Sequence, residues 1–256
     1  MPYIDFQQLV DIESDCLSLP SPNLSWHSVG RSHVGLVRDI NEDAFYHSTE
    51  QGIWAVADGM GGLARGDYAS GVVAEAFVHF VKLSTLASCI RDLEIRLRDA
   101  HSKCRSSFPG EPVGSAVVAL FNYGKYVFIL WAGDSRVYRL RDNQLEQLTQ
   151  DHTLAQERYT RGELSADQLA LHPSKDVLTR AVGIHQTLHL ELDYENVQQG
   201  DRYLVCSDGI YKDLSHSDIH KFLSESTAEH SLDALITGAL SKGGSDNITA
   251  IVVDAY

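Results

Sequence analysis

Five short acidic motifs carry the chemistry that this sequence could perform. Each contains an aspartate and lies beside a glycine or a turn signal, and most adjoin a strand-like apolar run. Carboxylates at strand ends beside glycines suit a hard divalent cation, because Mg²⁺ and Mn²⁺ take oxygen ligands in octahedral geometry and tolerate little crowding. The sequence therefore predicts a metal cluster. The motifs are Arg38-Asp39-Ile40-Asn41-Glu42-Asp43, Ala57-Asp58-Gly59-Met60-Gly61-Gly62, Gly133-Asp134-Ser135-Arg136, Ser207-Asp208-Gly209 and Gly244-Ser245-Asp246-Asn247.

The composition favours one acidic globular domain. The chain has 256 residues, and 21 Lys and Arg against 35 Asp and Glu give a formal net charge of −14. This charge repels phosphate backbones and anionic membranes, so we expect neither nucleic acid nor membrane as a partner. The longest apolar run, Tyr126–Ala132, is far shorter than the ~20 residues that span a bilayer.

The cysteines and the N-terminus predict a cytoplasmic protein. The four cysteines lack C-x-x-C spacing, and the first residues lack the basic and apolar regions of a signal peptide. We therefore expect reduced cysteines that pack as small buried hydrophobic residues. They are Cys16, Cys89, Cys104 and Cys206.

The elements that must position the acidic motifs follow from the hydrophobic pattern. Residues 1–25 contain Pro20 and Pro22 without clear periodicity, which predicts an N-terminal extension that carries no chemistry, followed by one domain over 26–256. Residues 151–178 are polar and contain Gly162 and Pro173, which indicates a surface excursion, a candidate substrate flap. Strand-like runs are predicted at 26–30, 43–47, 53–57, 114–121, 125–132, 136–140, 188–192, 201–206 and 249–254.

Helical spacing predicts two pairs of helices. Apolar residues recur at helical intervals from Val73 to Val81 and from Leu86 to Cys104, and again over 217–223, where Ser215 is placed as a cap, and over 228–240. Grouped helices between groups of antiparallel strands favour an α+β fold over a strictly alternating one. We expect helical hairpins to cover the faces of two packed sheets, with 114–121, 125–132 and 136–140 forming an antiparallel meander.

In order and spacing, these motifs resemble the metal-dependent protein serine/threonine phosphatases of the PP2C (PPM) family, in particular the compact bacterial members. The similarity runs from about Val29 to Val253, and the ordered co-occurrence of so many motifs makes it specific. The resemblance implies a central antiparallel β-sandwich flanked on both faces by helices, with a two-metal centre at one end. Besides the acidic motifs it includes Gly114-Ser115, Leu148-Thr149-x-Asp151-His152-Thr153, His172-Pro173 and Leu178-Thr179-Arg180-Ala181-x-Gly183.

The resemblance also implies roles for individual residues. The backbone carbonyl of Gly59 would add a metal ligand, Glu42 would hold metal-bound water, and Asp134 would help to form a weaker third metal site. Arg38 would bind the substrate phosphate with its planar guanidinium. Water between two cations loses a proton and can attack phosphorus, so no enzyme nucleophile is needed. The residues that would ligate or bridge two Mn²⁺ or Mg²⁺ ions are Asp43, Asp58, Asp208 and Asp246.

Each motif taken alone also has a structural interpretation. An isolated Asp208-Gly209 is usually a turn, and Gly133–Arg136 could be a hairpin turn. Arg38 alone would be a solvated surface cation, and Arg180 is expected to be a structural ion-pair donor. The twelve histidines lack the paired spacing of a zinc site and are interpreted as surface or core residues.

The sequence departs from the family at the position of the general acid. Animal relatives carry a histidine where this chain has Met60, and many bacterial relatives carry one where this chain has Leu63. The leaving seryl or threonyl oxygen would then take its proton from metal-bound water.

The predicted function is hydrolysis of phosphoserine and phosphothreonine on cytoplasmic proteins by a monomer that reverses a cognate serine/threonine kinase. Two interpretations from other classes stay open. One is a catalytically silent module of the same fold that binds phosphoproteins, whose signature would be loss of the metal aspartates, and none is lost here. The other is a metal phosphoesterase that acts on small phosphate esters or cyclic nucleotides, or a Ca²⁺-stabilised structural domain.

Overall fold

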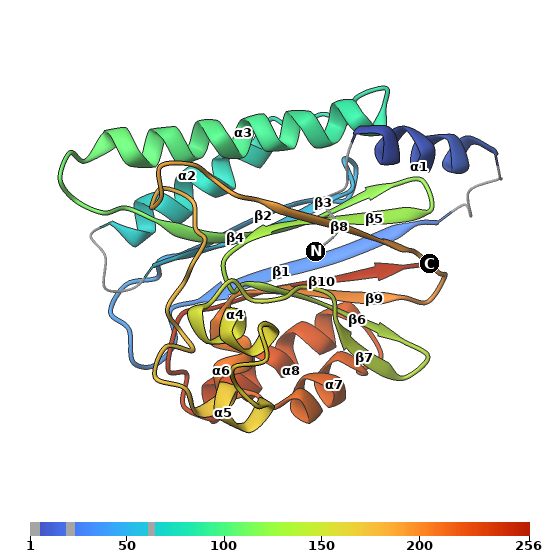
Figure 1. The fold of residues 1–256 in the computed structure, drawn as a ribbon. Helices are drawn as coiled ribbons and strands as arrows, with labels where there is room; N and C mark the ends of the chain where they lie inside the picture. The colour runs from blue at the N-terminus through green and yellow to red at the C-terminus, as the bar shows by residue number, and fades with distance from the viewer. Residues whose placement is uncertain (1–5, 19–23, 61–64) are drawn as a thin grey trace.

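Two five-stranded antiparallel sheets pack on each other in the computed structural model, which describes residues 6–18, 24–60 and 65–256 (Figure 1). The first sheet has the order β1-β10-β9-β6-β7 and the second β2-β3-β4-β5-β8. The strands of the first are β1 (Trp26–His33), β6 (Arg136–Arg141), β7 (Gln144–Gln147), β9 (Arg202–Cys206) and β10 (Ile248–Ala255). Those of the second are β2 (Asp43–Ser48), β3 (Ile53–Gly59), β4 (Ser115–Tyr123), β5 (Tyr126–Ala132) and β8 (Glu191–Asn196).

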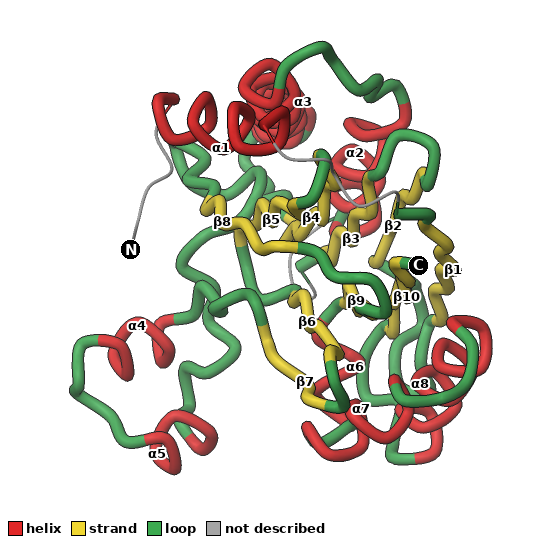
Figure 2. Tube along the Cα trace, turned by 90° about the vertical axis from the view of Figure 1, so that its right-hand side faces the viewer, coloured by secondary structure: helices red, strands yellow, loops and turns green. Residues whose placement is uncertain are grey.

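Helices cover the outer face of each sheet (Figure 1, Figure 2). The second sheet is covered by α2 (Gly66–Val78) and α3 (Leu86–Ser107), and the first by α6 (Asp208–Asp213), α7 (His216–Leu223) and α8 (Ala228–Ser241). The predicted α+β sandwich with helices on both faces is therefore confirmed. In the described parts of the chain, none of the helices combines the length and the apolar character that a membrane crossing requires.

Alternation along the central strands explains why they are apolar throughout. On β3, Ile53 and Ala55 face the helices, while Trp54 and Val56 face the opposite sheet. Successive side chains of a strand point to opposite faces, so a strand covered on both faces has no polar face. The same reasoning identified Tyr126–Ala132 as a buried strand, and all seven of its residues are buried.

The connection from β5 to β6 corrects the predicted meander. β4 and β5 pair as expected, but β6 joins the other sheet, where it pairs with β9 and β7. The chain crosses between the sheets at Gly133, whose φ of +122° favours glycine and where an added Cβ would lie 2.3 Å from the Cβ of Ala116. The alternative of a hairpin turn at Gly133–Arg136 is therefore wrong.

The N-terminal residues contain a helix that was not predicted, since Phe6–Ser18 form α1. Leu9, Ile12 and Cys16 are buried at helical spacing in the core under α3, a periodicity that the proline-rich residues after them obscure. Lys125 Nζ lies 2.8 Å from a carboxylate oxygen of Asp15, which ties α1 to the β4–β5 turn. The extension is thus partly structured.

Other boundaries differ by smaller amounts. The strand predicted at 188–192 is β8, at Glu191–Asn196, and the predicted flap contains two short helices, α4 (Leu154–Thr160) and α5 (Ala166–Leu171). β7 and α6 were not predicted. Ser215 caps α7 as expected, in a capping box in which its side chain accepts from the backbone N–H of Asp218.

Candidate metal centre

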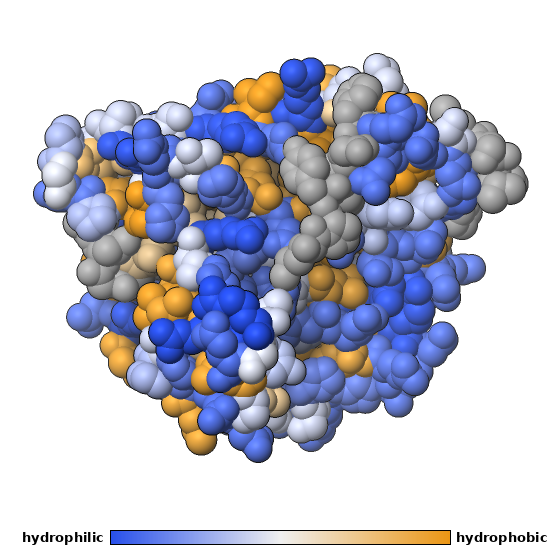
Figure 3. Space-filling view, viewed as in Figure 1, coloured by the Kyte–Doolittle hydropathy of each residue, from blue (hydrophilic) through white to orange (hydrophobic). Residues whose placement is uncertain are grey.

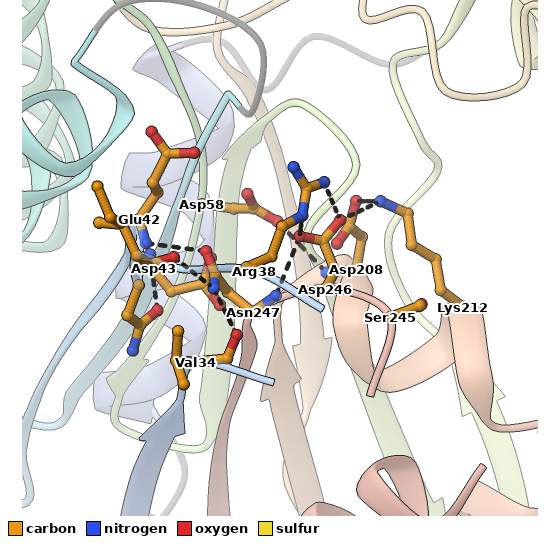
Figure 4. Close-up of polar contacts among 12 residues, drawn as sticks. Val34, Arg38, Glu42, Asp43, Asp58, Asp208, Lys212, Ser245, Asp246 and Asn247 are labelled. Carbon is orange, nitrogen blue, oxygen red and sulfur yellow. Dashed lines mark hydrogen bonds and ion pairs between the residues drawn. The ribbon is translucent and has the colours of Figure 1, made fainter. Parts of the chain in front are cut away.

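Antiparallel pairing brings the predicted aspartates to one end of the sandwich. Asp43 begins β2 and stands opposite Asp58, near the end of β3. On the other sheet, Asp208 follows β9 and Asp246 precedes β10, so both lie at the same edge because β9 and β10 are antiparallel neighbours. The hydroxyl of Ser207 donates to Asp43 across the two sheets at 2.7 Å. Figure 4 shows these carboxylates converging from separate elements.

A cavity of about 320 Å³ opens at this point, which we call the metal cavity. Of the predicted site residues, Asp43 and Glu42 do not line it. Asp43 lies behind the cavity, within electrostatic range of Asp208 and Asp246. The carboxylate of Glu42 points away from the aspartates in Figure 4. The predicted residues that line the metal cavity are Arg38, Asp58, Gly59, Asp134, Asp208 and Asp246.

Burial and mutual repulsion raise the pKa values of three of these carboxylates in the absence of cations. Burial, together with the charges of Asp208 and Asp246, raises the pKa of Asp43 to about 7. Burial and the charge of Asp208 also raise the pKa of Asp134 to about 8. The pKa of Asp58 is raised well above its usual range by burial and by neighbouring Asp208 and Asp43. Such a set of repelling oxygens favours a cation.

Two cationic side chains stand among the carboxylates. Lys212 Nζ lies 2.8 Å from Asp246 Oδ2 and also pairs with Asp208, while Arg38 Nε lies 2.9 Å from Asp246 Oδ1. Although burial acts to raise the pKa of Asp246, hydrogen bonds from Lys212 and Arg38 outweigh it and leave the pKa below its ordinary value. Lys212 was not predicted, although its place one helical turn after Asp208 was a usable signal.

The residues at the metal cavity suit divalent cations by the type of their ligand atoms, although they do not form a complete coordination geometry. Across residues 6–18, 24–60 and 65–256, no three Asp, Glu, His or Cys side chains meet in a geometry that could hold an ion as they stand. The ammonium of Lys212 forms ion pairs with the carboxylates of Asp208 and Asp246. The possible ligands are at least four clustered carboxylates, and the pKa of each is raised. They form the oxygen-rich set that Mg²⁺ and Mn²⁺ require.

A glycine lets three elements meet beside the metal cavity. The backbone N–H of Gly59 donates to the carbonyl of Glu42 at 3.0 Å, and an added Cβ would lie 2.4 Å from the carbonyl oxygen of Gly66. Burial raises the pKa of the Glu42 carboxyl, against a hydrogen bond from the backbone of Gly66. Met60 lines the cavity, whereas Leu63 lies outside the described residues.

Asn247 holds the loop that carries Arg38. Its side-chain amide donates to the carbonyls of Val34 and Ile40 at 2.8 and 2.9 Å, and its oxygen accepts from the backbone N–H of Glu42 at 2.8 Å (Figure 4). Three bonds from one side chain fix the loop between β1 and β2 over the start of β10. The sequence placed Asn247 in a motif without revealing this role.

A second cavity, of about 600 Å³, lies between the flap (residues 151–178) and the metal cavity, and we call it the flap cavity. Arg136 binds Asp151 at its wall through two hydrogen bonds of 2.8 and 2.6 Å, and its guanidinium stacks 3.5 Å above the ring of Tyr211. The hydroxyl of Tyr211 donates to the carbonyl of Asp134 at 2.8 Å. The two cavities share Asp134, Asp176 and Lys212.

Residues outside the cavities take the structural roles that were predicted for them. Arg180 Nη1 lies 3.0 Å from Glu191 Oε2, so the expectation of a structural ion pair is confirmed. His152 is buried, stacks on Trp131, and its Nδ1 accepts from the backbone N–H of Gly133 at 3.2 Å. The four cysteines are free and buried, as expected for small hydrophobic residues.

Comparison with known proteins finds one family. The family model described as "Protein phosphatase 2C" matches residues 29–241. The serine/threonine protein phosphatase PstP of Mycobacterium tuberculosis is 34% identical over 228 residues, which are 88% of this chain and 44% of PstP. The chain therefore spans less than half the length of that curated relative.

Solved structures of the same kind superpose on most of the chain. PppA, described as a key regulatory component of T6SS in Pseudomonas aeruginosa, is 38% identical with a TM-score of 0.83, covering 91% of this chain and 100% of PppA. The catalytic domain of PstP in complex with two manganese ions is 32% identical with a TM-score of 0.81, covering 91% of this chain and 99% of that domain.

Proposed function

The chain belongs to the protein phosphatase 2C family, and from this premise we propose that it is a metal-dependent protein phosphatase that hydrolyses phosphoserine and phosphothreonine. Family membership and the manganese-bound relative support dependence on divalent cations. Two ions, Mn²⁺ or Mg²⁺, would be held at the metal cavity, and a third, weaker site would use Asp134.

One observation carries the proposal. Two parts of the chain that are far apart in the sequence deliver Asp43 and Asp58, and Asp208 and Asp246, to one end of the sandwich, where Asp58, Asp208 and Asp246 border one cavity. Repelling carboxylates destabilise a fold unless they are neutralised, so their retention favours a function that needs them. This argues against the silent phosphoprotein-binding module, which would be free to lose them.

In this proposal, Asp43, Asp58, Asp208 and Asp246 would hold the cations, with the carbonyl of Gly59 as a further ligand. Bound divalent cations supply the positive charge that activates water and stabilises a transferring phosphoryl group. Glu42, hydrogen-bonded to Gly66, would orient water at the edge of the centre.

Arg38 would bind the phosphate of the substrate. It lines the metal cavity, its side chain is 40% exposed, and its guanidinium can donate two parallel hydrogen bonds to phosphate oxygens. Its bond to Asp246 sets the orientation of the guanidinium before substrate arrives, which reduces the conformational entropy lost on binding.

Protonation of the leaving oxygen would not use a histidine from the cavity wall. Among the described residues that line the metal cavity, none is a histidine, and Met60 carries no exchangeable proton. Water therefore remains our proposed proton source for the seryl or threonyl oxygen.

We also propose the substrates of the protein, its oligomeric state, its cellular location and its domain bounds. Phosphoproteins made by a cognate serine/threonine kinase would be the substrates, and the protein would act as a monomer. Four free, buried thiols support action in the reducing cytoplasm. Residues 26–256 would form the catalytic domain, with the flap at 151–178 and the extension at 1–25.

The test is hydrolysis of a phosphothreonine peptide with Mn²⁺, Mg²⁺ or Ca²⁺. We expect turnover with Mn²⁺ but not with Ca²⁺, and a loss of at least about 100-fold in kcat for Asp58→Asn, because metal-centre ligands supply several kcal/mol of transition-state stabilisation. Asp193→Asn, an exposed aspartate on β8, is the matched control and should retain activity. Full activity of Asp58→Asn would refute the assignment, and hydrolysis of small esters alone would favour the phosphoesterase alternative.

A further inference from the structure

Three large apolar side chains stand in solvent on the loop between β1 and β2. Leu36, Val37 and Ile40 are 66, 67 and 64% exposed, and we call them the apolar rim. Single exposed apolar residues are ordinary, but a group of them at one place marks a contact surface. Figure 1 places the β1–β2 loop at the left of the molecule, and the same side of Figure 3 shows hydrophobic surface.

The apolar rim lies on a loop that hydrogen bonds hold in place. Asn247 donates to the carbonyls of Val34 and Ile40, and the backbone N–H of Leu36 donates to the carbonyl of Gly244 at 2.8 Å. Gly35 fits so tightly that an added Cβ would lie 2.2 Å from the carbonyl oxygen of Asp246. The fold thus fixes these side chains outward.

The apolar rim adjoins the proposed catalytic site through Arg38. Arg38 lies between its members in the sequence, reaches Asp246 at 2.9 Å and lines the metal cavity. A cavity of about 320 Å³ admits a phosphorylated side chain but leaves most of the polypeptide that bears it outside. Because an extended chain advances about 3.3 Å per residue, the first few neighbours of the phosphorylated residue must lie over the surface around Arg38.

We propose that the apolar rim binds a hydrophobic side chain located within about three residues of the phosphorylated serine or threonine of a protein substrate. This inference rests on the proposed phosphatase function and adds a sequence preference to it. The flap cavity differs because it presents charged groups such as Arg136, Lys175 and Asp176 beside the apolar residues Leu169 and Ala170.

The test uses two phosphothreonine peptides that differ only in their flanking residues, leucine and valine in one and serine in the other. We measure the ratio of kcat/KM for the apolar peptide to that for the serine peptide. The wild-type ratio should be about tenfold, since burial of part of one aliphatic side chain is enough to change affinity by that factor. Val37→Ser and Ile40→Ser should each lower the ratio about threefold or more, by the same area argument.

The controls separate this binding surface from a general effect of removing exposed apolar groups. Val81, 62% exposed between α2 and α3, is the matched position, and Val81→Ser should leave the ratio unchanged. Val37→Leu should keep the preference because it keeps the apolar contact. Thermal unfolding of each variant checks that the fold is intact.

Three results would overturn the inference in different ways. Equal hydrolysis of both peptides by the wild-type protein would remove the apolar rim from substrate recognition while leaving the phosphatase function standing. Hydrolysis of neither peptide with Mn²⁺ would overturn the function and the inference together. A concentration-dependent dimer in sedimentation, lost in Ile40→Ser, would assign the apolar rim to a second copy of the chain instead.

Discussion

Lys212 Nζ lies 2.8 Å from Asp246 Oδ2 and pairs as well with Asp208, so one ammonium group bridges the end of β9 and the start of β10. Burial acts to lower the pKa of Lys212, but these two carboxylates outweigh it and raise the pKa. Lys212 therefore stays charged and neutralises the aspartates that we assign to the cations. It would compete with a metal ion for the same oxygens.

We expect Lys212→Met to bind Mn²⁺ more tightly. Charged hydrogen bonds contribute about 1.5–3 kcal/mol, so removal of the competitor should tighten the dissociation constant by about tenfold. The metal-free variant should melt at a lower temperature, because its carboxylates lose their counter-charge. Isothermal titration calorimetry measures the first effect. Lys242→Met, which removes an exposed partner of Asp218, is the control, and weaker Mn²⁺ binding by Lys212→Met would contradict the competition.

Arg38→Ala should raise KM for a phosphopeptide with a smaller effect on kcat, because we assign Arg38 to phosphate binding. About tenfold is expected for the loss of one charge-assisted contact at a partly exposed site. Steady-state kinetics at saturating Mn²⁺ measure both constants. Arg31→Ala, which removes an exposed arginine paired with Asp233, should leave KM unchanged. An unaltered KM in Arg38→Ala would take Arg38 out of the phosphate site.

The stability of the protein in a chelator should fall as pH rises from acidic to mildly basic values. Burial raises the pKa of Asp43 to about 7 and that of Asp134 to about 8, from a reference value of 3.8. The folded state then binds more protons at these groups than the unfolded state between these limits, so their contribution to stability is greatest at low pH and is lost as pH rises through the folded pKa values. Melting temperatures measured from about pH 5 to about pH 9, a range that brackets both pKa values, test this expectation. A melting temperature that rises over this range without metal would contradict it.

Leu9→Ala should destabilise the protein by about 2 kcal/mol or more while leaving phosphatase activity intact. Leu9 is 6% exposed in the core under α3, and α1 contacts the β4–β5 turn, at the opposite end of the sheet from Gly133. Urea denaturation measures the free energy of unfolding. Val10→Ala, at a position that is 38% exposed, is the matched control and should change it little. A drop in activity without a change in stability would place α1 in the function instead.

The strands were predictable because burial on both faces leaves continuous apolar runs, as in Tyr126–Ala132, and glycines mark where such runs end. Which sheet a strand joins was not predictable. Arg136 begins a strand whose partner, β9, comes much later in the chain, and local pattern carries no information about that pairing. The short helix α6 was not predicted because its sequence is short and the Asp208-Gly209 motif that begins it, taken alone, is typical of a turn.

Some residues of the site could also be predicted from the sequence, and others could not. Asp58 and Asp208 were identified because their motifs keep a recognisable order along the chain. The role of Asn247 was not, because its amide bonds to carbonyls more than 200 residues earlier, and only the folded chain brings them together. Lys212 could have been found from its spacing after Asp208, which places both on one face of a helix.

The arrangement of the aspartates in two pairs has a mechanical consequence. Asp43 and Asp58 belong to one sheet, while Asp208 and Asp246 belong to the ends of strands in the other. An ion held by members of both pairs would cross-link the halves of the sandwich, so neither half could separate without giving it up. Cation concentration would then set the cooperativity and the unfolding temperature of the whole domain, through the ordinary linkage between ligand binding and folding.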